Sequence, residues 1–400
     1  MGKTMRDFFV GWKPDKIAQL YFHNEVPVDG VCKSYFRITD LDMVKSIFKS
    51  PGMTFNGVNP NEKAVKKDGG IQARLYQMGA KRKSYGYFFR NLLWQLRKWK
   101  TRELMSWIDE FNPEVAFYAA GDYIFSMKIA LDICRMRNIP MIAYFGDDFY
   151  FLESDFKSPI ERLNRWQFRK QFEELFSYLS TFTAATDKLN EKYSSYFGKA
   201  GHAILSSTGF WGMEARNQMT KISYIGNLFP NRWKALIDIG RCLKELGFVI
   251  DVYSTQKDPK ILAQLNLVNG IHFQGGIPPN LVVEVIKAST IVVHAEALDD
   301  VSKQLTKYSL STKIGDLLGS GVCLFAYGPA EVASIEYLIA NDAACVCTLK
   351  DELGEKLLKI LKDAKLRQHY VSKALDLAAL RHDLAINADL FYEMVRGVVR

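Results

Sequence analysis

The residues from 307 to 321 place hydroxyl, cationic and acidic side chains at the start of a short predicted helix. Ser311 and Thr312 precede the helix, so we expect them to cap its first turn while free backbone N–H groups point at an anion. Lys313 adds positive charge, and Asp316 lies one turn beyond Thr312, where it could accept both hydroxyls of a ribose. This pattern predicts a diphosphate-and-ribose site. The alternative is a capped helix with an ordinary Asp in its first turn.

Three polar or small residues follow an earlier apolar strand, predicted over 222–226. Gly226 lets the backbone approach a ligand closely, and Asn227 comes next. Arg232 offers a planar fork of donors suited to phosphate oxygens, at the start of the following helix. We expect these residues to contact a phosphate. A helix-start Asn with a surface Arg is the simpler interpretation of the same residues.

A glycine turn after the strand predicted over 271–273 has a similar position. Gly275 and Gly276 expose backbone donors and acceptors beside the apolar Ile277. That combination suits a flat nucleobase, held by backbone hydrogen bonds and packed on one face. A plain tight turn explains the residues equally well.

Acidic residues follow two further strands. Asp147 and Asp148 come directly after an apolar strand at 141–145, and Glu296 follows the strand at 290–294. Paired carboxylates could hold a metal or act as the two acids of a hydrolase. We expect neither, because adjacent residues rarely direct both carboxylates at one ion. We predict instead that these three acids are the catalytic residues and contact a substrate in a cleft.

The order of elements indicates how these residues are brought together. Short continuous apolar strands alternate with helices, which is typical of a parallel sheet covered on both faces. We therefore predict an α/β protein with two Rossmann-like domains, at 1–206 and 207–374, and a final helix at 375–400 that packs back on the first domain. Ligands of such sheets bind at the carboxyl ends of the strands. The first domain looks as though its opening strand is missing, since a helical pattern follows Met1 at once.

The stretch 308–321 resembles the donor site of GT-B glycosyltransferases of family 4, especially bacterial enzymes of capsule, O-antigen and exopolysaccharide assembly. The likeness continues through Cys-Leu-Phe-Ala-Tyr-Gly-Pro and 333–338. It implies retaining transfer of a sugar from a nucleotide donor, with no metal or other cofactor. Asp316 matches the second acid of the family's Glu-x7-Glu pattern, which holds the ribose. Gly2 resembles the glycine turn that meets the donor phosphates.

The chain departs from that family pattern at one position. The first acid of Glu-x7-Glu falls on Tyr308, and Glu296 is the residue that could replace it. Because the departure affects recognition of the donor sugar, two alternatives stay open. One is another GT-B enzyme such as a nucleotide-sugar epimerase. The other is a non-catalytic two-lobed protein that binds a nucleotide sugar or acts as a scaffold.

Composition and charge bear on the compartment and partners. The six cysteines are scattered and lie mostly in apolar runs, which favours a reducing compartment. No apolar run approaches the length of a membrane span, so we expect a cytoplasmic protein. Residues 72–102 contain nine Lys/Arg and no Asp/Glu, interleaved with aromatic residues. We expect this segment to contact the inner face of the plasma membrane, near a saccharide or lipid-linked acceptor; a basic solvated helix is the alternative, and nucleic acid is not an expected partner.

Overall fold

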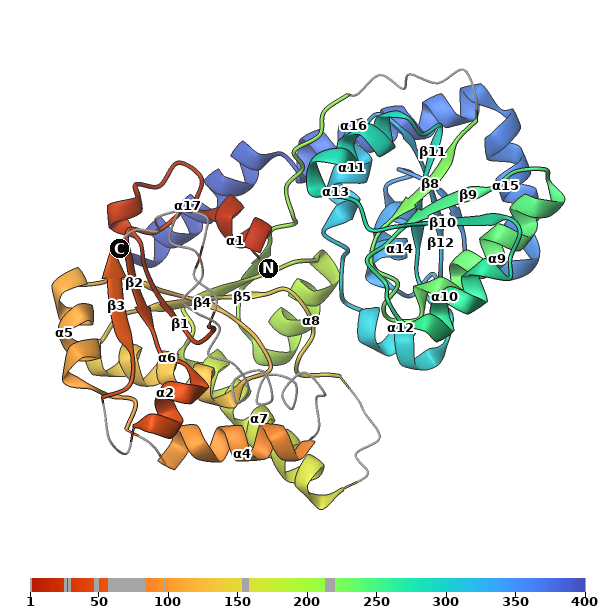
Figure 1. The fold of residues 1–400 in the computed structure, drawn as a ribbon. Helices are drawn as coiled ribbons and strands as arrows, with labels where there is room; N and C mark the ends of the chain where they lie inside the picture. Colours follow the sequence, from red (N-terminus) through yellow and green to blue (C-terminus); the bar gives the residue numbers. More distant parts are fainter. Residues whose placement is uncertain are drawn as a thin grey trace.

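The computed structural model describes residues 2–24, 27, 30–46, 50–56, 84–96, 98–152, 158–212 and 220–399. Its elements form two lobes: the first comes from the first half of the chain together with the last helix, and the second comes from residues of about 220 to 381 (Figure 1). The two segments that connect the lobes are residues 204–212 and the turn at His382 and Asp383. The architecture is mixed α/β, as predicted.

The C-terminal lobe contains a sheet of six strands, all parallel, in the order β10-β9-β8-β11-β12-β13. The strands are β8 (Ile222–Ile225), β9 (Ile250–Tyr253), β10 (Ile271–Gly275), β11 (Ile291–Ala295), β12 (Cys323–Tyr327) and β13 (Cys345–Cys347). The helices are α9 (Arg232–Glu245), α10 (Pro259–Asn266), α11 (Pro279–Lys287), α12 (Asp300–Thr306), α13 (Lys313–Gly319), α14 (Ala333–Ala340), α15 (Leu353–Lys362) and α16 (Ala364–Arg381).

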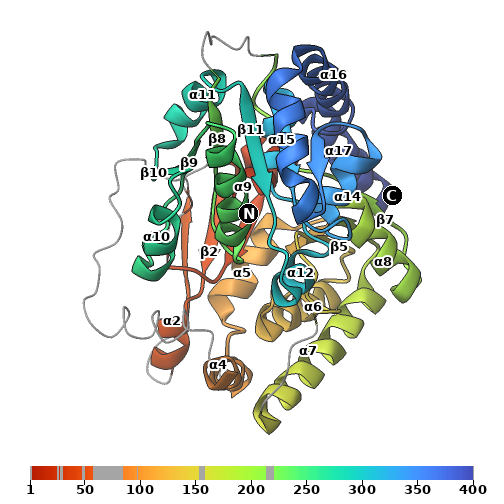
Figure 2. The ribbon, with the colours of Figure 1, turned by 90° about the vertical axis from the view of Figure 1, so that its right-hand side faces the viewer.

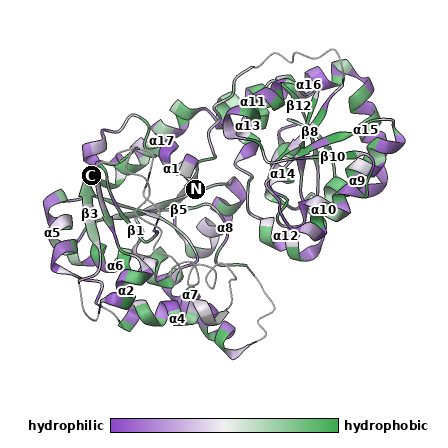
Figure 3. Cartoon of the chain, in the orientation of Figure 1, coloured by the Kyte–Doolittle hydropathy of each residue, from purple (hydrophilic) through white to green (hydrophobic). Residues whose placement is uncertain are grey.

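Burial explains why these strands contain unbroken apolar runs. Every residue of β11 and β12 is buried, because helices cover both faces of the sheet. Helix α9 packs one apolar face on the sheet through residues such as Leu236, Ile239 and Leu243. Hydrophobic residues accordingly dominate the central strands of this lobe, whereas hydrophobic and hydrophilic residues alternate along its helices (Figure 3).

The N-terminal lobe divides its strands between two sheets. One has the order β1-β2-β3 and the other β4-β5-β6-β7. The strands are β1 (Ala18–Tyr21), β2 (Ser34–Arg37), β3 (Met53–Asn56), β4 (Ala116–Ala119), β5 (Met141–Phe145), β6 (Thr181–Ala184) and β7 (Gly201–Ala203). The helices are α1 (Gly2–Phe8), α2 (Asp40–Lys45), α4 (Ser84–Leu96), α5 (Arg102–Phe111), α6 (Ile124–Arg137), α7 (Pro159–Tyr178) and α8 (Asp187–Phe197).

The two lobes differ at the centre of their sheets. In the C-terminal lobe the first strand, β8, lies between β9 and β11. In the N-terminal lobe, β1 and β4 are each at the edge of a sheet, and no strand among the described residues joins them.

The helix predicted over 375–400 is two helices in the structure. Residues 375–381 complete α16, which packs against α13 in the C-terminal lobe, and α17 (Leu384–Val399) returns to pack on α1. The break occurs at His382, whose ring is fully buried and hydrogen-bonded on both sides, to Ser206 O at 2.7 Å and Tyr337 Oη at 3.0 Å. Phe391 of α17 stacks on Phe8 of α1 at a centroid distance of 4.9 Å.

The helix predicted over 88–111 is also two helices. Helix α4 ends at Leu96, and Thr101 caps the separate helix α5 by accepting the N–H of Leu104 at 3.1 Å. The extended backbone of Thr101, with φ of −93° and ψ of 159°, interrupts the helix that the sequence suggested. The part of 72–102 that precedes residue 84 lies outside the described residues.

Candidate functional site

Lys313 is a cation without a counter-ion at the carboxyl edge of the C-terminal sheet. Its side chain is half-buried, and no hydrogen bond or ion pair to it exists among the described residues. A Cβ atom placed on Gly226 would lie 2.7 Å from Lys313 Nζ, so the glycine leaves the space that the ammonium occupies. Burial, and then the charge of Arg232, lower the pKa of Lys313 to about 8. Such a group is stabilised by a bound anion.

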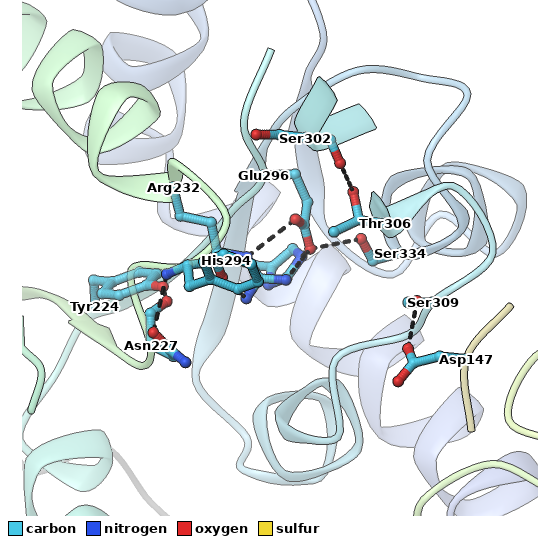
Figure 4. A network of polar contacts seen from close by, with 11 residues as sticks. Asp147, Tyr224, Asn227, Arg232, His294, Glu296, Ser302, Thr306, Ser309 and Ser334 are labelled. Atoms are coloured by element: carbon cyan, nitrogen blue, oxygen red, sulfur yellow. Dashed lines mark hydrogen bonds and ion pairs between the residues drawn. The ribbon is translucent and has the colours of Figure 1, made fainter. Parts of the chain in front are cut away.

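Arg232, at the first position of α9, lies beside Lys313 and is held by a buried carboxylate. Its Nε and Nη2 donate to the two oxygens of Glu296 at 3.0 and 2.9 Å, and Nη1 donates to Phe229 O at 2.8 Å (Figure 4). Glu296, just beyond β11, is 1% exposed. It also accepts the hydroxyl of Ser334 at 3.1 Å, and His294 Nε2 lies 3.1 Å away. Glu296 therefore fixes the position of Arg232.

Of the two cations Arg232 and Lys313, only Arg232 has a counter-charge among the described residues. Burial alone would raise the pKa of Glu296, but His294 and Arg232 outweigh burial and lower it to about 2. Glu296 is consequently ionised at neutral pH and neutralises Arg232. The positive charge of Lys313 stays uncompensated among the described residues, so an anionic ligand is the partner that this arrangement lacks.

The loop from Gly226 to Asn231 is shaped by its own side chains. Tyr224 donates its hydroxyl to Asn227 O at 2.6 Å, and Asn227 Oδ1 accepts the N–H of Phe229 at 2.9 Å. Asn231 adopts a left-handed backbone with φ of 47° and donates to Asp299 at 3.2 Å. The side chain of Asn227 thus holds the loop, which presents Gly226 and Arg232 toward Lys313.

Helix α13 begins without the cap that the sequence predicted. Thr312 has a helical backbone, with φ of −58° and ψ of −14°, instead of the extended backbone of a capping residue, and its side chain accepts no N–H of the helix. Ser311 contributes its carbonyl, which accepts the N–H of Ile314 at 2.9 Å. The prediction that Ser311 and Thr312 cap α13 through their side chains is therefore wrong, although both residues do immediately precede Lys313.

Asp316 points to the junction between the lobes. Lys3 Nζ, at the start of α1, lies 2.9 Å from Oδ1 and 3.0 Å from Oδ2. The backbone N–H of Gly209 also donates to Oδ1 at 3.2 Å. Gly2 is the first residue of α1 and brings Lys3 to this position. The contact between Lys3 and Asp316 could not be predicted from sequence spacing, because the two residues are 313 positions apart.

The glycine turn predicted for a nucleobase begins at Gly275, the last residue of β10, at the same edge of the sheet. Gly275 has φ of +78°, a left-handed conformation that favours glycine, and its carbonyl accepts the N–H of Ser254 at 2.8 Å. A Cβ on Gly276 would lie 2.9 Å from the Thr255 side chain. Ile277 is half-buried. The nucleobase contacts of Gly275 and Ile277 stay predictions.

The two acids after β5 have different surroundings. Asp148 Oδ1 accepts the hydroxyl of Tyr193 at 2.9 Å and the N–H groups of Tyr150 and Phe151 at 2.9 and 3.0 Å, so it organises its own loop. Arg165 supports the same loop by donating to Phe149 O at 2.7 Å and Leu152 O at 2.9 Å.

Asp147 faces the other lobe. Its Oδ1 accepts the hydroxyl of Ser309 at 2.6 Å, across the boundary between the lobes (Figure 4). Partial burial raises the pKa of Asp147, and the hydrogen bond from Ser309 opposes that rise. Beside it, Tyr308 packs on the N-terminal core and its carbonyl accepts the hydroxyl of Thr186 at 2.9 Å. Tyr308 is therefore docked on the N-terminal lobe.

The structure brings some predicted residues together and separates others. Gly226, Arg232, Glu296 and Lys313 form one cluster, whereas Asp316 and Asp147 lie at contacts between the lobes. The catalytic roles assigned to Asp147, Asp148 and Glu296 stay predictions. Within the described ranges, no group of three or more His, Cys, Asp or Glu residues could hold a metal ion.

Comparisons with known proteins identify the fold. No protein-family model matches the chain, and no curated protein sequence matches it. Solved structures that resemble it include HepE of Anabaena in complex with UDP and glucose, with a TM-score of 0.57, 12% identity and coverage of 95% of this chain and 99% of that one. A glycosyltransferase from Rickettsia africae has a TM-score of 0.55 and 10% identity, covering 83% and 89%.

Sucrose-phosphate synthase from Thermosynechococcus elongatus has a TM-score of 0.54 and 11% identity, covering 74% of this chain and 76% of that one. The fold that these proteins share is GT-B, in which two Rossmann-like domains face each other. This confirms the predicted fold class.

Proposed function

We propose that this chain is a glycosyltransferase that moves a sugar from a nucleotide-sugar donor to a saccharide or lipid-linked saccharide acceptor, with retention of anomeric configuration and without a metal. The observation that carries the proposal is the half-buried positive charge of Lys313, which has no counter-charge among the described residues and lies beside Arg232. Gly226, which has no side chain, leaves the space that this charge occupies. A diphosphate supplies the anion that this cluster lacks. The similarity in fold to HepE, whose structure holds UDP and glucose, supports the same proposal.

The reaction requires stabilisation of a departing diphosphate. As the bond between the anomeric carbon and the phosphate oxygen breaks, negative charge develops on the nucleoside diphosphate and positive charge on the sugar. Lys313 and Arg232 stabilise the leaving group. The acceptor hydroxyl attacks on the same face, forms the new C–O bond and passes its proton to the departing phosphate oxygen. Contact between the lobes excludes water that would otherwise hydrolyse the donor.

Acidic residues take different roles in this reaction. Asp147 lies at the boundary between the lobes and orients the acceptor hydroxyl, while Asp148 holds the loop that presents Asp147. Glu296 positions Arg232 instead of contacting the sugar, because it is buried and fully engaged by Arg232 and Ser334. Asp316 accepts the ribose hydroxyls.

Turnover with a panel of UDP-, GDP- and dTDP-sugars tests the function. Release of nucleoside diphosphate is expected with at least one donor, and Asp316→Ala is expected to abolish it. Asp342→Ala is the matched control, since Asp342 pairs with His369 on the surface of the C-terminal lobe. Epimerised donor would favour an epimerase. Binding without turnover under any acceptor would favour a non-catalytic nucleotide-sugar-binding protein, and the absence of both would contradict the proposal.

We also propose that the enzyme works at the inner face of the plasma membrane, where lipid-linked acceptors lie. Within the described part of 72–102, α4 exposes Phe89, Leu92 and Leu96 at 63%, 37% and 72%, spaced so that they share one side of the helix. Helix α7 lies beside α4 in both views (Figures 1 and 2) and exposes Trp166, with Lys170 Nζ 4.2 Å from its ring centroid. Exposed apolar side chains with cations suit an anionic lipid surface. No described helix is long and apolar enough to span a bilayer.

Vesicle binding tests that location. Phe89→Ser with Leu96→Ser is expected to reduce co-sedimentation with vesicles containing anionic phosphatidylglycerol. Val301→Ser is the control, because Val301 is 72% exposed on the C-terminal lobe. Equal sedimentation of both variants, or unchanged binding after neutralising Lys81, Arg82 and Lys83, would contradict membrane contact.

A further inference from the structure

The carboxylate of Asp316 has too few free acceptor positions for a ribose. A carboxylate offers about four lone-pair positions. Lys3 occupies one on each oxygen, at 2.9 and 3.0 Å, and the N–H of Gly209 takes a second on Oδ1 at 3.2 Å. One position on Oδ2 is left. Two vicinal hydroxyls that donate to both oxygens can therefore bind only if one present donor leaves.

Lys3 is the donor that can leave. Gly209 belongs to the connecting segment, whose backbone is fixed on both sides: Thr208 N donates to His382 O at 2.8 Å, and Gly212 N donates to Gly319 O at 2.9 Å. Lys3 is instead a flexible side chain, 38% exposed. Exposed ion pairs of this kind contribute little to stability and exchange partners readily.

The carboxylate of Asp7 is an alternative partner for Lys3. Asp7 lies four residues beyond Lys3 on α1, so both side chains share one side of the helix. Asp7 is only 7% exposed, and its Oδ2 has no hydrogen-bond partner among the described residues. Burial raises the pKa of Asp7, while the charge of Lys3 opposes the rise. A buried carboxylate oxygen without a hydrogen bond is costly, and a partner supplied in another state of the protein would favour that state.

We propose that Lys3 is a two-position switch that pairs with Asp316 in the empty enzyme and with Asp7 when a donor ribose occupies Asp316. This inference rests on the proposed function, because it assigns the ribose to Asp316. Binding of the nucleotide then removes an ion pair between the lobes and satisfies the buried acid on α1. The donor site thereby controls a contact that joins α1 to α13.

Calorimetric titration with UDP and GDP, on the full chain, tests the switch. Lys3→Met removes the competitor and is expected to tighten nucleotide binding about two- to fivefold, the range that loss of an exposed ion pair allows. Asp7→Asn removes the second position and is expected to weaken binding by a similar factor. In the Lys3→Met background, Asp7→Asn is expected to have no effect. Lys303→Met is the control, since Lys303 pairs with Asp300 and Glu331 away from the site.

Two outcomes would overturn the switch. Equal or weaker nucleotide binding by Lys3→Met, with normal thermal unfolding, would show that Lys3 helps the ligand instead of competing with it. Additive effects of Lys3→Met and Asp7→Asn would show that the two residues are not alternatives. Failure of every variant and of the wild-type chain to bind either nucleotide would overturn the proposed function together with the switch, so the two failures are distinguishable.

Discussion

Lys313 is the residue on which the functional interpretation depends most. An ammonium that is half-buried beside Arg232, with no counter-ion among the described residues, destabilises the folded state in its charged form. The folded-state pKa of about 8 lies below the ordinary lysine value. Below pH 8 the full penalty is therefore present, and it disappears as pH rises toward the ordinary pKa.

Replacing Lys313 with Met should separate stability from ligand binding. Removal of the buried charge is expected to raise the free energy of unfolding at pH 7 by on the order of 1 kcal/mol, while nucleotide binding falls at least tenfold. Thermal unfolding and calorimetric titration measure the two effects. A variant that is less stable than the wild-type chain would indicate that Lys313 has a partner that satisfies it in the folded state.

The same pKa predicts how binding depends on pH. Nucleotide affinity should fall as pH rises through the folded-state pKa of about 8, because the neutral amine no longer attracts a diphosphate. Titrations between pH 6 and 9.5 measure this fall, and Lys313→Met should abolish it. An affinity that stays flat up to pH 9.5 would contradict the role of Lys313.

Glu296 should matter through Arg232. Glu296→Gln leaves Arg232 buried without its counter-charge, and removal of one partner of a buried pair costs about 3 to 5 kcal/mol. We expect a large fall in unfolding temperature together with weaker nucleotide binding. Glu352→Gln is the control, since Glu352 forms an exposed pair with Lys356 and its loss should cost less than about 1 kcal/mol. Similar unfolding temperatures for both variants would refute the structural role of Glu296.

At the scale of elements, α13 depends on glycine where it meets the connecting segment. A Cβ on Gly319 would lie 2.3 Å from the backbone oxygen of Phe210, which cannot move aside like a flexible side chain. A Cβ on Gly315 would lie 2.8 Å from both Ser206 O and the ring of His382. Close approach of backbone to backbone therefore positions α13, and with it Lys313.

Gly319→Ala is accordingly expected to destabilise the chain by about 1 to 3 kcal/mol, as overpacking does, and to weaken nucleotide binding by displacing α13. Gly354 in α15 provides the matched control, because a Cβ there meets nothing within 4 Å. Gly354→Ala should stabilise by about 0.5 to 1 kcal/mol through helix propensity. Thermal unfolding compares the two, and a Gly319→Ala chain as stable as Gly354→Ala would contradict this packing.

The local sequence pattern predicted the buried strands well, but it predicted the short strands and the polar ends of helices less well. Strand β5 has the predicted bounds, because five consecutive buried apolar residues leave a clear signal. The short strands β2 and β3 and the helix α8 were not predicted, since the pattern of apolar residues in each of them is weak. The cap at Ser311 and Thr312 was predicted incorrectly, because the sequence does not reveal that Thr312 itself takes a helical backbone.

At the scale of the whole molecule, the lobes meet through polar contacts that join distant parts of the chain. Lys3 contacts Asp316, Ser309 contacts Asp147, and Arg381 contacts Asp187 at 2.8 Å. None of these pairs could be predicted from sequence spacing, since each depends on how the folded lobes face each other. Among these residues, Asp147 was predicted as a site residue because it follows a strand, and Asp316 because it lies one turn beyond Thr312.

Calorimetric titration of the full chain with UDP, GDP and dTDP, with Lys313→Met in parallel, tests whether this protein binds a nucleoside diphosphate at Lys313. At least one of the three is expected to bind the wild-type chain and to stabilise the fold by roughly 2.7 kcal/mol at a hundred times its dissociation constant. Lys313→Met is expected to lose most of this binding. Absence of binding by all three, or equal binding by Lys313→Met, would contradict binding at Lys313.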